Sequence, residues 1–367
     1  MNESDIKVDR VARIAHEAGV GGVLLTLQRN FAWLTGGASN RIDGSREPGA
    51  GTLFVAADGR RFVIANMIEM PRLQGEALAG LGFEPVEYPW IEDQANPAAA
   101  ADRARSLMSG AAAIAADAAV ARDVVVAETA LMRARSHLID EEVTRYRALG
   151  RDMGTAVGEA CRSLRPGTSE QDIANAVAAA VHGANARPVV LLVGADDRIA
   201  RFRHPVATDH VWRKTAMVAV CAERHGLIVS LSRLVTVGEM ETALRERTAA
   251  TAQVFGKVLA ASREGTSGAQ LFDVVSRAYA EVGYPREEEK HHQGGAIGYR
   301  TREWIAHPGS QEMVKSTQAF AWNPTITGTK VEDTVLLVNG ELELITGSPD
   351  WPTIDIGRVA AATVLVV

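Results

Sequence analysis

Cysteine is scarce in this chain of 367 residues, which contains only Cys161 and Cys221. Two cysteines are too few for a disulfide framework, and their spacing is not that of a metal site, so we expect two buried free thiols in a reducing cytosol. No apolar run approaches the roughly 20 residues that a membrane-spanning helix needs. The first seven residues contain no apolar signal core. These absences predict a cytoplasmic protein that does not contact a membrane.

Positive charge is not in excess either. The chain has 39 lysines and arginines against 45 aspartates and glutamates, a net charge of −6. Without a basic cluster, such a chain is a poor candidate for binding nucleic acid. Its 47% apolar and 23% charged residues are typical of a globular protein and exclude fibrous and largely disordered classes. At about 150 residues per domain, the length predicts two domains.

Helical and strand patterns alternate over roughly the first 130 residues. Apolar residues at helical spacing predict a first helix, which Ser4 or Asp5 can cap. A short apolar run from Gly22 is typical of a buried strand. Two further strands on either side of Asp58-Gly59 predict a β-hairpin.

Three later segments of this half have helical character. We expect helices near residues 68–80 and 97–110. Residues 111–121 are rich in alanine, the best helix former, which favours a helix or a compact connection. Together these elements predict a mixed α/β unit.

A repeat marks the second half of the chain, which we expect to start near Ile139. The segment Arg165-Pro-Gly-Thr-Ser recurs 98 residues later as Arg263-Glu-Gly-Thr-Ser. Each copy follows a long helical stretch and opens another helix, with a capping box from Thr168 to Gln171 or from Ser267 to Gln270. The second half of the chain is therefore predicted to contain two α–α–β–β copies with a ligand cleft between them. Two unrelated helix starts are the alternative.

Four segments of the second half carry a family resemblance. They cover residues 216–233, 291–299, 320–324 and 330–337. In this order they resemble the motifs of the pita-bread family, which includes methionine aminopeptidase, proline-specific aminopeptidase and dipeptidase, and creatinase. The first half also fits, because Asn30-Phe-Ala-Trp-Leu-Thr-Gly is similar to a motif of the creatinase and prolidase branch.

The resemblance implies an α+β fold with two domains. Residues 1–135 would form a smaller α/β N-terminal domain of the creatinase/prolidase type. Residues 139–367 would form a pita-bread domain of two pseudo-twofold related α-α-β-β halves. The resemblance also implies a homodimer, because this branch builds its sites partly from a partner's N-terminal domain.

The positions of the family's metal ligands are the main departure. Its peptidases hold two metal ions with two Asp, one His and two Glu. Position by position, these ligands fall on Ala219, Ser230, Gly295, Asn323 and Glu332, and Glu332 alone keeps its carboxylate. One carboxylate cannot hold a dinuclear pair. We therefore expect no metal and no other cofactor.

Two residues remain as candidate catalytic groups. His204 matches a histidine that the family places beside its metals, and that acts as the general acid/base in metal-free creatinase. Imidazole suits this role near neutral pH. Glu332 would orient His204, bind a cationic substrate or share a proton, and a buried carboxylate needs a partner such as Arg203, Arg302 or Lys330. A structural histidine and a leftover salt bridge are the plain alternatives.

Further residues are candidates for binding the substrate. Arg302 and Glu303 fall where peptidases carry His-Glu, and the fork of an arginine there suggests a carboxylate-bearing substrate; a surface ion pair is the alternative. The remaining candidates are His291, Gln293, Asn323, Arg203 and Arg41, the last on a loop that family members bring over a neighbouring active site.

A run of charged residues and histidines at 286–292 could suggest a metal site. Consecutive residues are not expected to converge on one ion, and at most one or two of residues 291–293 can face the cleft. We expect 286–290 to form a solvated loop. Trp322 is expected in the core.

These expectations favour a metal-independent hydrolase similar to creatinase in mechanism and not in substrate. It would cleave a C–N bond, or catalyse a related elimination, in a small carboxylate-bearing amino-acid-like or amide molecule. One alternative is a pita-bread protein that binds a peptide or ligand without turnover. A divergent Xaa-Pro peptidase is the second alternative, and the lost ligands count against it.

Overall fold

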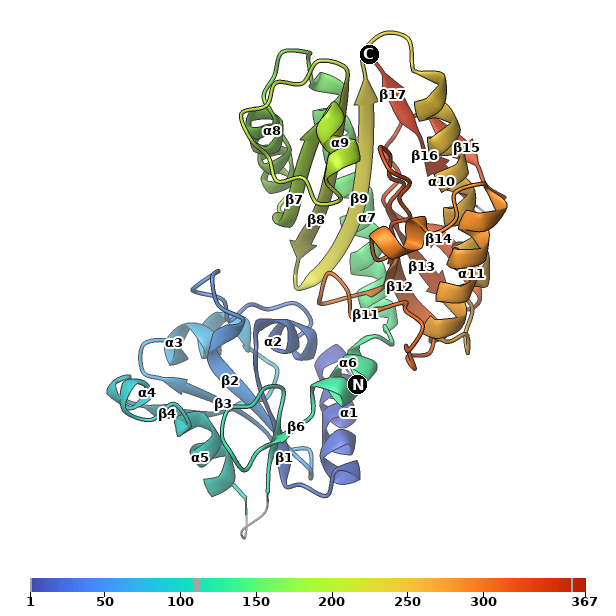
Figure 1. Ribbon diagram of the computed structural model, residues 1–367. Helices are drawn as coiled ribbons and strands as arrows, with labels where there is room; N and C mark the ends of the chain where they lie inside the picture. Colours follow the sequence, from blue (N-terminus) through green and yellow to red (C-terminus); the bar gives the residue numbers. More distant parts are fainter. Residues whose placement is uncertain (1, 109–112, 358) are drawn as a thin grey trace. The chain divides into compact units, whose positions relative to one another are not determined.

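The structure is a computed structural model that describes residues 2–108, 113–357 and 359–367. The chain divides into two units, Met1–Arg135 and Ser136–Val367 (Figure 1). Each unit has a sheet and helices of its own. None of the described helices is long and apolar enough to cross a membrane.

A mixed sheet forms the centre of the first unit. Its described strands follow the order β4-β3-β2-β1-β5-β6. The predicted hairpin is confirmed, because β2 and β3 pair antiparallel on either side of Asp58-Gly59. Gly59 has a φ of 87°, which the turn requires and glycine adopts without strain. The strands are β1 (Gly22–Leu27), β2 (Pro48–Ala56), β3 (Arg61–Asn66), β4 (Glu84–Tyr88), β5 (Ala115–Ala116) and β6 (Val125–Val126).

Short helices accompany this sheet. The first helix is capped by Asn2, and not by Ser4 or Asp5 as predicted, because the Asn2 side chain accepts a bond of 2.9 Å from the Asp5 backbone amide while Asp5 bonds back to Asn2. The helical segments predicted at 68–80 and 97–110 are shorter. The helices are α1 (Glu3–Glu17), α2 (Gln28–Leu34), α3 (Met70–Arg72) with a π-turn (Leu73–Ala77), α4 (Ile91–Ala95), α5 (Ala99–Ser106) and α6 (Glu128–Arg135).

The alanine-rich segment, predicted as a helix or a compact connection, forms no helix in its described residues. Residues 111 and 112 lie outside the described residues, and Ala115 and Ala116 form β5 rather than a helix. They pair in parallel with Val23 and Leu24 of β1 and are fully buried. Pairing with a central strand overrides the helix propensity of alanine here.

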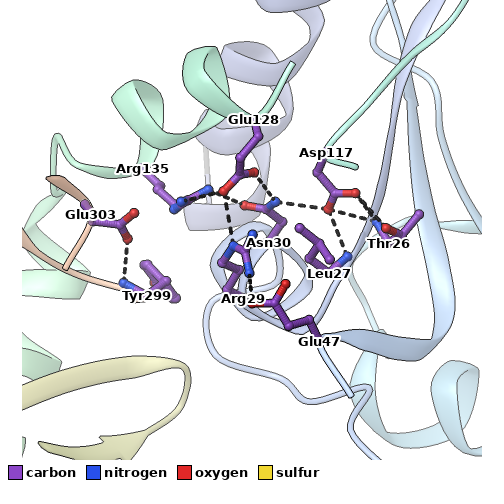
Figure 2. Close-up of polar contacts among 10 residues, drawn as sticks. All are labelled: Thr26, Leu27, Arg29, Asn30, Glu47, Asp117, Glu128, Arg135, Tyr299 and Glu303. Atoms are coloured by element: carbon purple, nitrogen blue, oxygen red, sulfur yellow. Dashed lines mark hydrogen bonds and ion pairs between the residues drawn. The ribbon is translucent and has the colours of Figure 1, made fainter. Parts of the chain in front are cut away.

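A buried polar network ties the first unit together (Figure 2). Asp117 accepts hydrogen bonds from the backbone amides of Thr26 and Leu27, each at 2.9 Å, and from the Asn30 amide at 3.0 Å. Asn30 also bonds to Glu128 at 3.1 Å and accepts a bond of 2.8 Å from Arg135. Burial raises the pKa of Asp117, while its hydrogen bonds act in the opposite direction. The asparagine of the Asn30-Phe-Ala-Trp motif therefore joins the β1–α2 junction to the residues after β5.

The second unit contains the predicted repeat. Helices α7 (Asp140–Ser163) and α8 (Glu170–Gly183) precede strands β7 (Arg187–Ala195), β8 (Thr215–Arg224) and β9 (Leu227–Thr236). Helices α10 (Thr242–Ala261) and α11 (Gly268–Glu281) precede β10 (Gly294–Ile297), β12 (Thr317–Trp322) and β13 (Asp333–Val338) in the same order (Figure 1). Each copy of the repeat also contains one isolated antiparallel β-bridge at an equivalent position. These bridges join Ser169 to Val211 and Ser267 to Met313. The α+β architecture of two related halves is confirmed.

Additional elements complete the second unit. The first sheet has the order β17-β9-β8-β7 and the second the order β11-β10-β12-β13-β14 among the described strands. Trp322 on β12 is fully buried, as predicted. The additional elements are α9 (Asp197–Arg201), a 3-10 helix (Glu287–Lys290), β11 (Trp304–Ile305), β14 (Glu341–Leu344), β15 (Thr353–Asp355), β16 (Ala360–Ala362) and β17 (Val364–Val366).

One of the two predicted capping boxes is confirmed. Ser267 caps α11 and forms a box with Gln270. The box predicted between Thr168 and Gln171 is wrong, because Ser169 caps α8 and accepts a bond from the Asp172 amide at 3.1 Å. The equivalent serine of each repeat thus starts its second helix.

The two halves meet where β9 runs beside β13. The backbone amide of Ser232 donates to the carbonyl of Glu332 at 3.0 Å, and the amide of Ser230 donates to the Thr334 hydroxyl at 2.7 Å. A buried ion pair of 3.0 Å between Arg233 and Asp333 lies beside this seam. The seam fixes the position of Glu332 relative to the first half of the repeat.

Helix α7 depends on glycine at its contact with the segment after β14. A Cβ atom on Gly154 would lie 2.3 Å from the carbonyl oxygen of Gly347. We expect Gly154→Ala to destabilise the protein by about 1–3 kcal/mol, because the backbone must move to admit the methyl group. Chemical denaturation followed by circular dichroism measures this change.

Gly183, the last residue of α8, is the matched control because a Cβ there would meet nothing within 4 Å. Gly183→Ala should leave stability unchanged or raise it by up to about 1 kcal/mol. Equal effects of the two substitutions would contradict the packing argument.

Candidate active site

A cavity of about 290 Å3 opens in the second unit, where the two halves of the repeat meet. Strands β7 and β8 supply its apolar wall, and the segments around β10, β12 and β13 supply most of its polar groups. Its lining comprises Val190, Leu192, His204, Ala219, Val220, Cys221, His292, Thr301, Arg302, Asn323, Lys330 and Glu332. Seven of these side chains can donate or accept hydrogen bonds or protons through nitrogen or oxygen, so the cavity is equipped for a polar ligand.

Glu332 is the acidic centre of this cavity. It is 4% exposed, and its Oε1 lies 3.0 Å from the Arg302 Nη2 atom. Its Oε2 lies 3.1 Å from Lys330 Nζ and accepts a bond of 2.6 Å from the Ser232 hydroxyl. Of the three cations that the sequence offers as partners, Lys330 and Arg302 are therefore the ones that pair with Glu332.

The ionisation of Glu332 follows from these partners. Burial by itself would raise the pKa of the carboxyl, but the cations of Lys330 and Arg302 and the bond from Ser232 lower it to about 2. Glu332 is therefore a carboxylate at neutral pH. Glu332, Lys330 and Arg302 form a charged triad. It contains one negative and two positive charges, so its net charge is about +1, which favours an anionic ligand.

Three histidines lie beside this triad. His204 follows α9, and its Nε2 lies 2.9 Å from Nε2 of His291. The ring of His292 stacks on that of His291, with centroids 4.4 Å apart. Burial, and then the Lys330 cation, lower the pKa of His204, while Glu332 acts in the opposite direction. His204 is therefore a neutral imidazole at pH 7.

His291 determines which nitrogen of His204 is basic. Nδ1 of His291 faces the carbonyl oxygen of His292, so this nitrogen carries the proton. Nε2 of His291 then accepts a hydrogen bond from the Nε2–H of His204. This arrangement leaves Nδ1 of His204 unprotonated and able to accept a proton.

The residues at the family's metal positions do not fit a pair of metal ions. A Cβ on Gly295 would lie 2.2 Å from the Trp304 carbonyl oxygen, because β10 is paired on both sides at this point. No ligating side chain fits there without a shift of the backbone. Ser230 lies 3.0 Å from Sγ of Cys221, and Ala219 offers no donor. Glu332, the one carboxylate among the described lining residues, is already neutralised by two cations.

Three buried polar atoms around the cavity have no hydrogen-bond partner within the described part of the chain. They are Nε of Arg302, Oδ1 of Asn323 and Nδ1 of His292. A buried polar atom normally has a partner, in the protein or in a ligand. A ligand that presents an anionic oxygen to Arg302 and an N–H group to Asn323 would satisfy two of them.

Five predicted site residues do not line this cavity as the structure describes it. One of them, His291, contacts the lining residue His204 instead. Arg203 pairs with Glu287 at 2.6 Å, and the side chain of Gln293 accepts a bond of 2.6 Å from Tyr279. Glu303 accepts a bond of 2.8 Å from the Tyr299 amide (Figure 2). Arg41 belongs to the first unit, where its Nε donates to Gln28 at 2.6 Å.

The charged run at 286–290 also differs from its prediction as a solvated loop. Glu287–Lys290 form a 3-10 helix, and Glu287 is buried. Glu287 pairs with both Arg203 and Lys290. The run therefore holds Arg203, the neighbour of His204 on the loop after α9, and leads directly into His291.

Sequence reasoning missed three polar residues that line the described cavity, which are Lys330, His292 and Thr301. Lys330 was expected only as a possible partner of Glu332, and His292 was not among the site residues. Lys330 lies two positions before Glu332 in an extended segment, so period-two alternation places both side chains on one face. That signal could have identified it.

Removal of the negative charge of Glu332 should strongly lower the stability of the protein. Glu332→Gln leaves Lys330 and Arg302 without a counter-charge in a buried position, and we expect a loss of about 3–5 kcal/mol in the free energy of unfolding at pH 7. The pKa of Glu332 is lowered from 4.5, so the wild-type advantage is complete above pH 4.5 and is lost as the pH falls through about 2. Denaturant titrations at several pH values measure both effects.

Glu343→Gln is the matched control. Glu343 pairs with Arg147 at 2.8 Å on the surface, where both side chains are nearly half exposed. Its loss should cost less than about 1 kcal/mol. If Glu332→Gln costs no more than this control, the ion-paired centre is not a stabilising element.

Known structures resemble the whole chain. Dipeptidase PepE from Mycobacterium ulcerans is 18% identical with a TM-score of 0.79, over 100% of this chain and 98% of that chain. Xaa-Pro dipeptidase from Bacillus anthracis is 18% identical with a TM-score of 0.75, over 99% and 100%. The N-terminal domain of FACT complex subunit SPT16 from Cicer arietinum is 11% identical with a TM-score of 0.70, over 94% and 96%. At these identities the likeness shows the fold.

Sequence comparison identifies the family. No curated protein sequence matches the chain. The sequence model of metallopeptidase family M24, however, matches residues 144–339, which is more than half of the chain and includes every residue of the cavity. The expected resemblance to the pita-bread peptidases is thereby confirmed, and this chain belongs to metallopeptidase family M24, a family of hydrolases.

Proposed function

We propose that this chain is a hydrolase that works without a metal ion. It would cleave a C–N bond, or catalyse a related elimination, in a small amino-acid-like or amide molecule that bears a carboxylate. The observation that supports this proposal best is the buried carboxylate of Glu332, held by Lys330 and Arg302 where the family holds a metal ion. A neutral histidine, His204, lies at the edge of the same cavity.

In the proposed reaction His204 is the general acid/base. Its Nδ1 accepts a proton from a water molecule as the water oxygen attacks the carbonyl carbon. The same nitrogen then returns the proton to the leaving nitrogen as the C–N bond breaks, which balances the hydrolysis. His291 acts as a positioning residue, because its hydrogen bond to His204 fixes the tautomer that this step needs.

The cavity supports a small anionic substrate. Its volume is at the lower end of the roughly 300–1,000 Å3 of most ligand pockets. Nε of Arg302 would donate to a carboxylate oxygen, and Oδ1 of Asn323 would accept from an N–H of the substrate. The positive charge of the triad would favour the carboxylate further. Creatine is excluded from the proposal, because a single acidic residue lines the described cavity.

We also propose that the protein acts as a cytoplasmic homodimer. Both described cysteines are free and buried, which suits a reducing compartment. The dimer rests on the resemblance of the first unit to the creatinase and prolidase branch. In that arrangement the loop of Arg41 would reach the site of the partner.

Ligand binding without turnover is the second candidate function. The likeness to the SPT16 domain from Cicer arietinum shows that this fold occurs outside the peptidases. The lost ligand positions suit a binding protein as well as they suit a metal-free enzyme. A proline-specific peptidase with two metal ions is disfavoured by Ala219 and Gly295.

A turnover screen separates these functions. After dialysis against a chelator, the protein is incubated with N-acylated amino acids and small amides, and the release of amine or ammonia is followed. For any substrate found, His204→Ala should lower kcat/KM by about 100- to 10,000-fold. His307→Gln, an exposed histidine outside the cavity, should leave the rate unchanged. Activity that needs added manganese, or that survives His204→Ala, would overturn the proposed mechanism.

Thermal stability tests the substrate class separately. A carboxylate ligand should raise the melting temperature of the wild-type protein, because it binds the folded state alone. Arg302→Lys keeps a cation beside Glu332 and removes the Nε donor, so the shift should fall by at least half. An equal shift in this variant would show that Arg302 does not hold the carboxylate.

A further inference from the structure

Two histidines that line the cavity, His204 and His292, form a cluster with His291 outside the family's metal positions. Each of His204, His291 and His292 offers a ring nitrogen, and these three atoms all lie within 4.8 Å of one another. The consecutive residues His291 and His292 thus have their ring nitrogens close together, although they were not expected from the sequence to converge on one ion. His291 and His292 precede β10, which begins at Gly294, so the alternation of a strand does not separate their side chains.

We propose that this cluster binds one divalent transition-metal ion of the zinc, cobalt or nickel class. The ion would coordinate one nitrogen of each imidazole and complete its shell with water or an anion. His204 would bind it through Nε2, so the proton of this nitrogen would move to Nδ1 of the same ring. Three histidines with one open position are a common donor set for such ions. The cluster offers nitrogen atoms and no carboxylate oxygen, which disfavours magnesium, calcium and manganese.

One of the three nitrogen–nitrogen distances suits such an ion after a small adjustment, and the others, which reach up to 4.8 Å, would shorten when the ion binds. Two nitrogen ligands of a tetrahedral zinc ion lie about 3.3 Å apart, given bonds of about 2.0–2.1 Å. Nε2 of His204 and Nε2 of His291 are 2.9 Å apart. The two nitrogen atoms would have to move apart by a few tenths of an ångström. His204 lies on an exposed loop that can make this shift.

Hydrogen bonds already orient the proposed ligands. The Nδ1 atom of His291 faces the His292 carbonyl, which directs the lone pair of its Nε2 toward His204. Metal-bound histidines usually have such a second partner. Nδ1 of His292 is buried with no hydrogen-bond partner among the described residues, so it is a further donor that a ligand could satisfy.

The neighbouring charges predict a particular ligand sphere. Lys330 and Arg302 lie on the same cavity, and Glu332 neutralises only one of these two charges. The remaining positive charge weakens the binding of a dication and favours an anion as its fourth ligand. We therefore expect stronger metal binding in the presence of a small carboxylate than in its absence.

Bound metal would also oppose the proposed function. A cation on His204 removes the imidazole from proton transfer, so zinc should inhibit any turnover found. This consequence rests on the proposed function. The binding itself does not, and the two are tested by different measurements.

Cobalt titration tests the site on the full-length protein, purified without a histidine tag. Cobalt(II) in a tetrahedral nitrogen site gives an intense visible absorption, whereas octahedral cobalt gives a weak one. We expect the intense band to saturate at one equivalent per chain and to disappear when zinc is added. His291→Gln and His204→Gln should each lower the affinity at least tenfold.

His307→Gln serves as the matched control and should bind cobalt like the wild type. His204→Gln changes an exposed side chain, and its circular dichroism spectrum will show whether the fold is kept. Absence of the intense band would overturn the site, as would a band that both cluster variants retain. If cobalt binds while no substrate is turned over, the metal site stands and the proposed enzymatic function falls.

Discussion

The second unit depends on how one buried carboxylate is neutralised. Glu332 lies at the seam between β9 and β13, where a lone charge would be very costly. Lys330 and Arg302 supply the compensation from the protein itself, at 3.1 and 3.0 Å. A metal ion at this position would compete with both cations. The chain keeps the architecture of its family, and we propose that its own side chains supply the positive charge that metal ions supply in the family.

This substitution changes the chemistry that the cavity can support. In the metal-free reaction that we propose, an imidazole transfers the proton, and hydrogen bonding to His291 fixes the tautomer of His204. The net positive charge of the triad and the unpartnered atoms of Arg302 and Asn323 suit a ligand with one anionic group and one N–H group. The same histidines, brought together by the loop before β10, also provide the donor set for a single transition-metal ion.

Much of the fold could be predicted from the sequence, because local signals and the tertiary structure agree there. The Asp58-Gly59 hairpin and the repeated helix starts are examples. The strand at Ala115 was not predicted, since pairing with β1 decides its conformation and helix propensity does not. In the site, Glu332 and His204 could be expected from their positions in the motifs. The pairing of Arg203 with Glu287 could not, because it depends on a contact between residues 84 positions apart.

We infer that an internal ion pair replaces the family's dinuclear centre in this chain. Equilibrium dialysis of the full-length protein against manganese, followed by elemental analysis, tests it most directly. Manganese prefers carboxylate oxygens, so it reports on the family's positions and not on the histidine cluster. We expect that the protein retains no stoichiometric amount of bound manganese after dialysis. Two manganese ions per chain would contradict it and restore a two-metal peptidase.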